Sequence, residues 1–282
     1  MSIYISSACI KESDLGTNLR SLFDLGFGNV ELTGGINFEE NVKPAILNFL
    51  SLGNTNFQFH NYSPCPKEEF VLNLASQHKE TFETSKAHVK DTLSLTRELK
   101  LGKYAVHAGF YIPVNASELG KTIKRRELFD KEISKQLFVE TVSELYQEFP
   151  EELYVENNVV SQSNFQEYNQ NPFMLTCSEE YFELKREIKG FKLLLDLAHL
   201  KVSCQTLGLD FYEEAHILCQ ETDYIHISDN DGSADTNKGV NATSSMAKLL
   251  QELPLKSKTI TLEVYSGIED LMNTYRLVQE LN

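Results

Sequence analysis

The chain has 282 residues, of which 41% are hydrophobic and 24% charged, and this ordinary globular composition is sufficient to bury one large core. Its formal net charge of −15 argues against a nucleic-acid-binding protein, because phosphate recognition normally needs a basic surface. The dense basic cluster from Lys121 to Arg126 is interpreted as the solvated start of a helix.

Short β-rich runs recur eight times along the chain and are predicted to be strands. In chain order they are Ile3–Ile10, Asn29–Thr33, Asn56–His60, Tyr104–His107, Leu153–Asn157, Lys192–Asp196, Asp223–Ile227 and Thr259–Tyr265. Segments with a helical spacing of apolar residues lie between them. These predicted helices are Asp14–Leu25, Val42–Leu52, Leu72–Leu101, Lys121–Phe149, Ser178–Ile188, Asp210–Cys219, Ser245–Leu253 and Ile268–Leu281.

The alternation of strands and helices predicts parallel strands joined by right-handed crossovers. Eight such units favour an α/β fold, a closed (β/α)8 TIM barrel that residues 1–282 form as a single domain. The alternative is an open doubly wound sheet, which usually has a glycine-rich loop after its first strand, and SSACIKESDLG does not fit that pattern. The longest predicted loops, Asn115–Lys121 and Asp229–Ser245, follow strands and so lie on the face where barrels carry active sites.

The cysteines and the amino-terminal sequence indicate the expected location. There are five cysteines, an odd number, and none form a CxxC pair, which favours a reduced cytoplasmic protein. The first residues, MSIYISSACIKESD, lack the basic and long apolar regions of a signal peptide. Because the chain has no run of ~18 apolar residues, we expect no membrane-spanning segment.

Ionisable side chains occur at or near the carboxyl ends of the predicted strands. They are Glu31, His60, His107, Glu156, Asp196, His226 and Glu263, with His199 and Asp229 just beyond two strands. In a barrel these strand ends meet at one mouth. Buried charges are costly and neighbouring carboxylates repel, so a bound divalent cation would relieve both penalties. The set predicts a metal site suited to Mn, Zn, Co, Mg or Fe.

Each of these residues also has a structural interpretation when it is considered alone. A single histidine is more often a hydrogen-bonded core residue than a ligand, and an Asp at a strand end often caps the next helix. Glu31 fits a buried salt bridge as well as it fits a place at the mouth. The metal prediction therefore rests on the joint pattern.

Six segments together resemble the xylose-isomerase-like barrels, a superfamily of sugar isomerases, sugar epimerases and apurinic endonucleases of the endonuclease IV type. The segments are FQFH with His60, VHAG with His107, VEN with Glu156, LLLDLAH with Asp196 and His199, IHISDNDG with His226 and Asp229, and TLEVY with Glu263. The resemblance covers the whole chain in strand order. It implies a TIM barrel that binds a divalent metal at its mouth.

In the epimerases of this superfamily, one metal is held by a Glu, an Asp, a His and a Glu from strands five to eight. The resemblance therefore implies that Glu156, Asp196, His226 and Glu263 are the metal ligands here. The endonuclease branch uses the same four ligand types.

That branch also adds histidines, which implies His60, His107 and His199 as candidate ligands of a second metal or as substrate contacts. It further has an Asp-x-His pair after strand seven. In this chain Asp235 matches the Asp, but Asn237 stands in place of the His. Because a neutral amide is a poor substitute for imidazole on zinc, this departure argues against a complete trinuclear cluster.

The leading hypothesis is a metal-dependent isomerase or epimerase of carbohydrate metabolism that acts on a sugar, a sugar phosphate or a cyclitol. The metal would polarise a hydroxyketone and stabilise an ene-diolate as a proton leaves the neighbouring carbon. Glu156 and Glu263 would remove and return that proton, while His199 would bind a substrate oxygen. Asp229 would either orient His226 through its second ring nitrogen or cap a turn.

Three alternatives remain open at the level of the sequence. A metal-dependent phosphoesterase similar to endonuclease IV would use two metals, with His60 and His107 as ligands. A multi-iron oxidative enzyme would bind two or three irons, and a non-catalytic sugar-binding barrel would show no turnover. The expected partner is a small carbohydrate-like molecule, neither nucleic acid nor membrane, and the sequence is compatible with a homo-oligomer.

Overall fold

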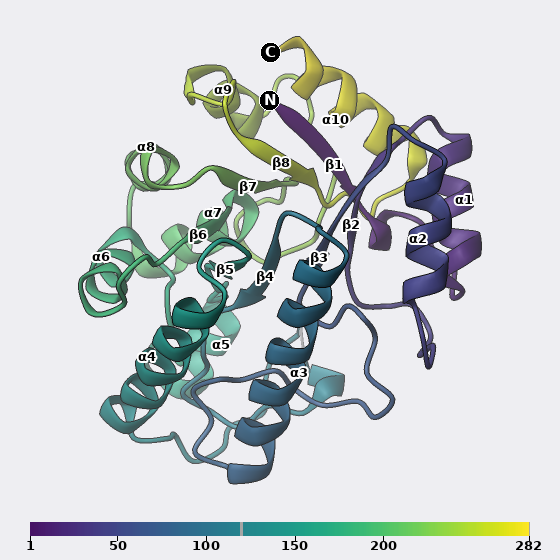
Figure 1. Cartoon of the computed structure of the whole chain (residues 1–282). Coiled ribbons are helices and arrows are strands. Elements are labelled where there is room, and N and C mark those ends of the chain that lie inside the picture. Colours follow the sequence, from purple (N-terminus) through teal and green to yellow (C-terminus); the bar gives the residue numbers. More distant parts are fainter. Residues whose placement is uncertain (119–120, 282) are drawn as a thin grey trace.

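The computed structural model of the protein describes residues 1–118 and 121–281. In this part of the chain, parallel strands close into a barrel in sequence order, with β8 hydrogen-bonded to β1 (Figure 1). The strands are β1 Ser2–Ser6, β2 Asn29–Leu32, β3 Asn56–His60, β4 Tyr104–His107, β5 Leu153–Glu156, β6 Leu193–Asp196, β7 Tyr224–Ile227 and β8 Thr259–Leu262. The prediction of a closed (β/α)8 barrel is confirmed, and the open sheet is excluded.

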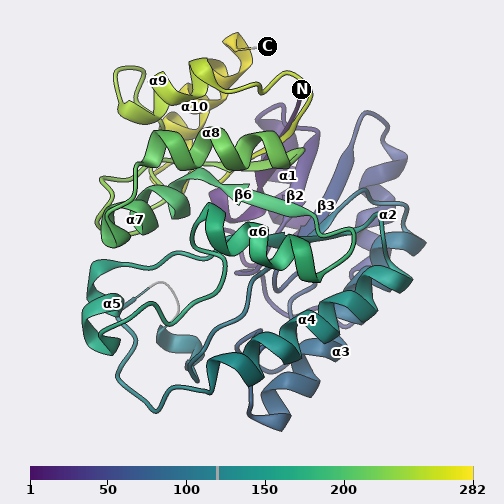
Figure 2. The same cartoon turned by 90° about the vertical axis from the view of Figure 1, so that its left-hand side faces the viewer.

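Helices form the outer layer around the strands, as Figures 1 and 2 show from two sides. They are α1 Leu15–Asp24, α2 Lys43–Ser51, α3 Lys79–Glu98, α4 Lys131–Glu148, α5 Gln162–Tyr168, α6 Ser178–Glu187, α7 Leu197–Leu207, α8 Phe211–Glu221, α9 Ser245–Glu252 and α10 Ile268–Glu280. Two short 3-10 helices, η1 Ser7–Cys9 and η2 Ala116–Glu118, follow β1 and β4. Among the described residues, none of the helices combines the length and the apolar composition that crossing a membrane requires.

The alternation of side chains along the strands separates the core from the site. Val106, Leu195 and Ile260 face outward and are buried in the main core between strands and helices. The next residues along each strand face the barrel interior, where Tyr154 and Tyr224 pack with a ring-centroid distance of 5.4 Å. Because side chains repeat their direction every two residues, the inward positions nearest the carboxyl ends carry the polar residues.

Two predicted helices begin too early. The segment Leu72–His78 is a connection rather than the first turns of α3, because Leu72 and Leu74 are buried and Asn73 Oδ1 accepts from the backbone N–H groups of Ala75 and Phe110. Likewise α4 starts at Lys131, where the Asp130 carboxylate accepts from Ile133 N at 3.1 Å.

The basic cluster from Lys121 to Arg126 is therefore not at a helix start. It lies in the connection between β4 and α4, where Asn164 Oδ1 accepts from Ile123 N and Glu118 binds Arg126 at 2.7 Å. These contacts replace helical hydrogen bonds. The predicted loop Asn115–Lys121 contains η2 and falls partly on residues 119 and 120, which lie outside the described residues.

Helices α5 and α7 were not predicted. Strands β1 and β8 end four and three residues earlier than predicted, and β2, β5, β6 and β7 are each one residue shorter. Beyond Ser6 the chain turns into η1. Beyond Leu262 the Glu263 N–H still donates to Ile227 O of β7 at 3.1 Å, but the Tyr265 N–H donates to Asn237 O in the connection after β7. Helix α7 begins directly after β6, with no intervening loop. The apolar run LLLDLAH spans both elements and gives no sign of the change from strand to helix.

Candidate metal centre

The predicted metal ligands Glu156, Asp196, His226 and Glu263 meet at the carboxyl ends of β5 to β8. Each offers one ligand atom, and these atoms lie within 4.8 Å of one another. His226 Nδ1 is 3.5 Å from Glu156 Oε1, 3.9 Å from Asp196 Oδ2 and 3.4 Å from Glu263 Oε2. All four side chains are buried. We call these four residues the quartet.

The geometry of the quartet fits a divalent cation. Ligand atoms at about 2.1 Å from a tetrahedral ion are separated by about 3.4 Å, which is close to the distances around His226 Nδ1. Glu156 Oε1, Asp196 Oδ2 and His226 Nδ1 are buried without a hydrogen-bond partner. An unpaired buried polar atom is costly. Three such atoms directed at one another therefore indicate a site for a cation that prefers oxygen and nitrogen ligands.

Asp196 has a second contact that fixes its position. Its Oδ1 accepts from His199 N at 2.7 Å and caps α7, and its backbone N–H donates to Asn157 Oδ1 at 2.7 Å. The carboxylate thus ends β6, starts α7 and still directs Oδ2 at the quartet. This explains why a strand of leucines ends in a buried Asp.

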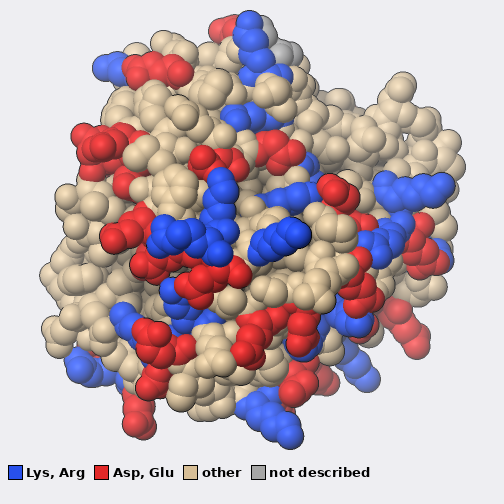
Figure 3. Space-filling view, turned by 60° about the vertical axis from the view of Figure 1, so that its left-hand side comes forward, with Lys and Arg blue, Asp and Glu red and all other residues tan. Residues whose placement is uncertain are grey.

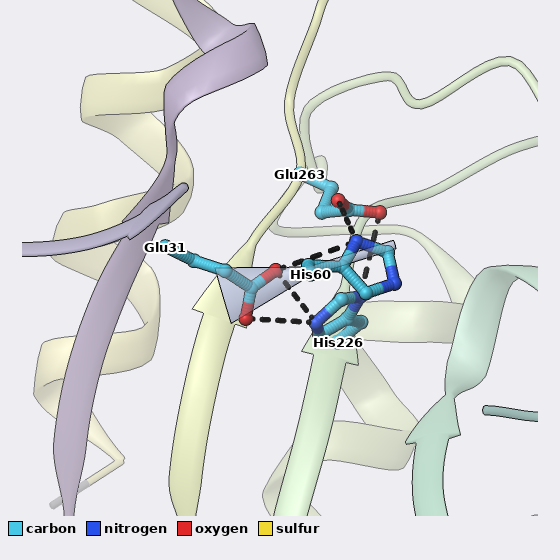
Figure 4. A group of neighbouring side chains, drawn as sticks. All are labelled: Glu31, His60, His226 and Glu263. Carbon is cyan, nitrogen blue, oxygen red and sulfur yellow. Dashed lines mark hydrogen bonds and ion pairs between the residues drawn. The ribbon is translucent and has the colours of Figure 1, made fainter. Parts of the chain in front are cut away.

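Glu31 contacts His226 at Nε2, the ring nitrogen that does not face the quartet, and Figure 4 shows its carboxylate beside the His226 ring. His226 Nε2 is 3.2 Å from Glu31 Oε2 and 3.0 Å from Oε1, so it can donate its proton to Oε2 while Nδ1 keeps a lone pair for a metal. The same oxygen accepts from Gln58 Nε2 at 2.7 Å, Thr261 Oγ1 at 2.8 Å and the Tyr224 hydroxyl. Glu31 is therefore itself fixed.

Asp229 does not have the orienting role that the sequence suggested for it. Its Oδ1 pairs with Lys201 Nζ at 2.6 Å and accepts from Asn230 N at 2.8 Å. Its backbone exchanges hydrogen bonds with Lys238, so it belongs to the turn after β7. Glu31 takes the position beside His226 instead.

His60 and His107 lie beside the other oxygen of Glu156. His60 Nε2 is 2.7 Å and His107 Nδ1 is 3.1 Å from Glu156 Oε2, and the three form a second group of candidate ligands. His107 Nδ1 has no hydrogen-bond partner. Glu156 thus directs Oε1 at the quartet and Oε2 at His60 and His107, which are the residues that would help to hold a second cation.

A further grouping of Glu31, His60, His226 and Glu263 is also compact. Figure 4 shows the Glu31 carboxylate beside the two rings and the Glu263 carboxylate above them. A metal there would have to take Nε2 of His226, the atom that faces Glu31 at 3.0 Å, while Nδ1 faces the quartet. A neutral imidazole has one lone pair, so we assign Glu31 as a hydrogen-bond acceptor.

His199 and Asp235 lie at the outer edge of the cluster. His199 Nε2 is 3.3 Å from Asp235 Oδ2, and its Nδ1 is 3.0 Å from the carbonyl oxygen of Asn157. Asn237 donates through Nδ2 to Asp235 at 3.1 Å, and its Oδ1 accepts from Ser228 Oγ. The amide oxygen of Asn237 is engaged by Ser228, so Asn237 supports Asp235 and offers no imidazole-like ligand.

Burial and mutual charge shift the pKa values of the cluster in different directions. Burial raises the pKa of Asp196 to about 7 and lowers the pKa of His107 to about 4. Burial also opposes ionisation of Glu156, but the charges of His107 and His60 outweigh it and hold the Glu156 pKa well below its usual value. Burial opposes protonation of His226, but Glu31 and Glu263 raise its pKa well above the usual value.

A cavity of about 460 Å³ adjoins the cluster over the carboxyl ends of β3 to β7. His107, His199 and Asp235 line it, so these three residues lie between the buried quartet and the open space. A small molecule in the cavity would reach the cluster from this side.

Comparison with solved structures identifies proteins whose fold is similar to that of this chain. A D-tagatose 3-epimerase-like protein superposes with a TM-score of 0.75 at 14% identity, covering 100% of this chain and 97% of the other. The two proteins therefore share the (β/α)8 barrel fold. The 3-keto-D-glucoside 4-epimerase YcjR from E. coli, in its apo form, matches with a TM-score of 0.68 at 10% identity, over 100% and 98% of the two chains.

Endonuclease IV from Thermus thermophilus has the same fold, with a TM-score of 0.63 at 14% identity over 100% of this chain and 98% of the other. No protein-family model matches the chain, and no curated protein sequence matches it. At these identities the likeness is one of fold, and one fold hosts several activities. The side chains of the site therefore have to carry the functional argument.

Sequence reasoning missed the polar layer beneath the quartet. Gln58, Tyr224 and Thr261 hold Glu31, and each lies two residues before an inward-facing residue of the mouth. The two-residue repeat of side-chain direction could have identified these residues, because Gln58 and Tyr224 lie two residues before His60 and His226.

Proposed function

We propose that the protein is a divalent-metal-dependent isomerase or epimerase that acts on a sugar, a sugar phosphate or a cyclitol. The observation that carries the proposal is the convergence of three unpaired buried atoms, Glu156 Oε1, Asp196 Oδ2 and His226 Nδ1, beside a cavity. The likeness in fold to an L-ribulose 3-epimerase and a D-psicose 3-epimerase supports the same class.

Two carboxylates of the quartet support a role in proton transfer. A cation held there would polarise the carbonyl of a hydroxyketone and stabilise the negative charge that develops beside it. Glu156 and Glu263 lie on either side of His226 Nδ1, at 3.5 and 3.4 Å. One carboxylate removes the proton from the carbon beside the carbonyl, and the other returns a proton to it.

Neighbouring residues prepare each carboxylate for this role. Glu156 is ionised at neutral pH because its pKa is held well below the usual value, and His60 keeps it oriented at 2.7 Å. Glu263 Oε1 accepts from the Tyr265 hydroxyl at 3.2 Å. His199 and Asp235, which line the cavity, bind substrate hydroxyl groups.

Replacement of Glu263 by Gln tests this assignment. Purified protein loaded with Mn, Co or Zn is incubated in deuterated water with a panel of ketoses and their phosphates, and exchange of the proton beside the carbonyl is followed by NMR. We expect the wild type to exchange at least one substrate and Glu263→Gln to lose about 10²- to 10⁴-fold in rate, because the variant lacks the carboxylate base.

Glu180→Gln is the matched control, since Glu180 is a largely buried carboxylate that binds Thr176 away from the quartet. It should keep the wild-type rate. Protein that retains no ion when metal is supplied in excess, or equal exchange rates in Glu263→Gln and the wild type, would overturn the proposal.

Hydrolysis of a phosphodiester is the second candidate, favoured by the group His60, His107 and Glu156. It requires a second cation bridged by Glu156. Elemental analysis distinguishes the two candidates, because one tight metal per chain supports isomerisation, whereas two metals with cleavage of bis-p-nitrophenyl phosphate support hydrolysis. Two or three irons per chain would point to oxidative chemistry, and ligand binding without turnover would point to a sugar-binding barrel.

We also infer a cytoplasmic role in carbohydrate metabolism, in which the cysteines remain reduced. The structure pairs none of Cys9, Cys65, Cys177, Cys204 and Cys219 in a disulfide among the residues it describes. Thiol titration of protein purified without reductant checks this inference, with five free thiols per chain expected.

A further inference from the structure

Asn157 continues the pairing of β5 with β6 beyond the end of β5, and it does so with its side chain. A backbone bond runs from the Asn157 N–H to the carbonyl oxygen of Leu194, at 3.3 Å. In a regular parallel ladder the next bond would run from the Asp196 N–H to the backbone carbonyl of Asn157. Instead, Asp196 N donates to Asn157 Oδ1 at 2.7 Å, and Asn157 Nδ2 donates to the Asp196 carbonyl oxygen at 3.0 Å. The side-chain amide thus replaces a peptide group of the ladder.

The backbone carbonyl that this replacement leaves unused accepts a hydrogen bond from His199. His199 Nδ1 lies 3.0 Å from the Asn157 carbonyl oxygen and 3.6 Å from Glu156 Oε1, so the carbonyl is the closer acceptor. Because a carbonyl oxygen can only accept, Nδ1 carries a proton, and Nε2 is the nitrogen that faces Asp235, at 3.3 Å. His199 and Asp235 both line the cavity. The orientation of His199 at the cavity therefore depends on Asn157.

The Asn157 amide is buried and fits in one orientation. Asn157 is 1% exposed, so water does not compete for its hydrogen bonds. The Asp196 N–H requires an acceptor and the Asp196 carbonyl requires a donor, which fixes Oδ1 and Nδ2 of the amide. Asp196 in turn directs its Oδ2 at the other residues of the quartet. Asn157 therefore acts on the site through Asp196 and His199.

We propose that Asn157 is a positioning residue of the metal centre, with two effects. By pairing with the backbone of Asp196, the Asn157 side chain holds Asp196 Oδ2 toward the quartet. By leaving its carbonyl oxygen to His199, Asn157 keeps the His199 Nδ1 proton away from Glu156 Oε1. The proposal rests on the proposed function in one respect, since it takes the quartet to be a cation site. It applies to isomerisation and to hydrolysis alike.

Asn157→Leu removes both amide groups and keeps the approximate size of the side chain. The buried Asp196 N–H then lacks a partner, which is costly, and the backbone carbonyl at position 157 is the acceptor that a regular ladder offers it. Once Asp196 takes this carbonyl, His199 loses its acceptor, and Glu156 Oε1 lies within reach of Nδ1 at 3.6 Å. A hydrogen bond to that oxygen competes with a cation for a ligand atom of the quartet.

Competition with a chelating dye for Zn tests the effect on metal binding. Asn157→Leu and the smaller Asn157→Ser should each bind Zn about 10- to 100-fold more weakly than the wild type, because removal of a group that orients metal ligands has this cost. The visible spectrum of the Co-loaded protein should change in the same variants, since a ligand oxygen changes direction. Wild-type Zn affinity in both variants would overturn the proposal.

Asn73→Leu is the matched control, because Asn73 makes the same pair of hydrogen bonds away from the quartet. Its Oδ1 accepts from Phe110 N at 3.0 Å, its Nδ2 donates to the Phe110 carbonyl oxygen at 3.0 Å, and it is also buried. The control variant loses buried hydrogen bonds of the same kind and should keep wild-type Zn affinity. An equal loss of affinity in Asn73→Leu and Asn157→Leu would show a general loss of structure and contradict the positioning role.

The proton on His199 Nδ1 is tested in metal-free protein by NMR. In protein isotope-labelled at the histidine ring nitrogens, the His199 signals are identified by their absence from His199→Gln. The wild type should have a proton on His199 Nδ1 that exchanges slowly with water, and Asn157→Leu should show faster exchange at this nitrogen. An unprotonated His199 Nδ1 in the wild type would overturn the proposal even if neither variant at position 157 folds.

These outcomes are separable from the fate of the isomerase assignment. Zn binding that is weakened as expected in the Asn157 variants, in a protein that exchanges no proton with any ketose, would leave the inference about Asn157 intact and remove the isomerase assignment. Ketose exchange combined with wild-type Zn affinity in both Asn157 variants would remove the inference about Asn157 alone. A wild type that retains no Zn would overturn both.

Discussion

Both ring nitrogens of His226 make contacts, and the contact at one nitrogen fixes the protonation state of the other. Glu31 faces Nε2 at 3.0 Å, and the quartet faces Nδ1. A carboxylate that accepts the proton of a ligand histidine fixes the tautomer and raises the basicity of the coordinating nitrogen. Three further donors hold the Glu31 oxygen that faces His226, so Glu31 would act on a metal in the quartet through His226 without contacting it.

Glu31→Gln is predicted to weaken metal binding while the barrel stays folded. The amide can still accept from His226 but carries no charge, so we expect about a 10- to 100-fold loss in Zn affinity. Competition with a chelating dye measures that affinity, and the visible spectrum of the Co-loaded protein should shift with the altered His226 ligand. Glu180→Gln serves again as the control with unchanged affinity, and an unaltered Zn affinity in Glu31→Gln would refute the positioning role.

The pKa of Asp196 predicts how metal binding responds to pH. Burial raises this pKa from 3.8 to about 7, and only the ionised carboxylate binds a cation. Protons therefore compete with the metal below pH 7, and the raised pKa of His226 adds to the competition. We expect at least a tenfold lower apparent Zn affinity at pH 6 than at pH 8, and a flat profile would show that the ion does not use Asp196.

The same shift sets the sign of the pH dependence of stability without metal. A folded-state pKa above the unfolded value means that Asp196 contributes stability at low pH, which is lost as the pH rises from 3.8 to about 7. Bound metal reverses this loss because it neutralises the carboxylate.

At the scale of elements, the mouth is shaped by close approaches between connections. Gly109 follows β4, and a Cβ atom there would lie 2.4 Å from Ala75 Cβ and 3.0 Å from Met174 Sδ. Ala75 belongs to the connection after β3 and Met174 to the connection after β5. Gly109 thus lets three connections meet just beyond His107.

Gly109→Ala is predicted to destabilise the protein by about 1–3 kcal/mol, because the added methyl must displace backbone-anchored neighbours. A loss of 1 kcal/mol corresponds to a fall of about 2–4 °C in Tm for a chain of similar size. Gly102→Ala is the matched control, since a Cβ at Gly102 meets no atom within 4 Å and should leave Tm unchanged. Equal Tm values for the two variants would show that the mouth yields to the extra methyl.

An element can be predicted from the sequence when a local sequence pattern determines it, and not when contacts with distant residues do. The strands follow from their apolar runs, and the placement of Asp196 and His226 follows from the two-residue period, so the quartet could be predicted from strand ends alone. Helix α7 could not, because Asp196 is both the last strand residue and the helix cap. The connection that precedes α4 is held by side chains that are distant in the sequence, such as Asn164, so no local sequence pattern predicts it.

At the scale of the whole molecule, acidic residues lie among the positive charges, and several lysines and arginines form ion pairs with them. Figure 3 shows lysines and arginines interspersed with acidic residues on one face. Lys86 pairs with Glu144 between α3 and α4, Arg97 with Glu152, and Lys135 with Glu187. Such pairs and a net charge of −15 leave a surface that repels a polyanion, although the fold is shared with an endonuclease IV.

The protein is therefore predicted not to bind DNA with an endonuclease's affinity. Fluorescence anisotropy with a labelled duplex that contains an abasic analogue should give no saturation up to about 100 µM protein at physiological salt, since even non-specific binders reach Kd values of roughly 10⁻⁴–10⁻⁶ M by neutralising phosphates. Lowering the salt should not rescue binding, because a chain with a net charge of −15, whose cations lie among acidic residues, attracts a polyanion weakly even without screening. Submicromolar binding that weakens steeply with salt would instead locate a basic surface, and together with a second metal on His60 and His107 it would favour hydrolysis over isomerisation.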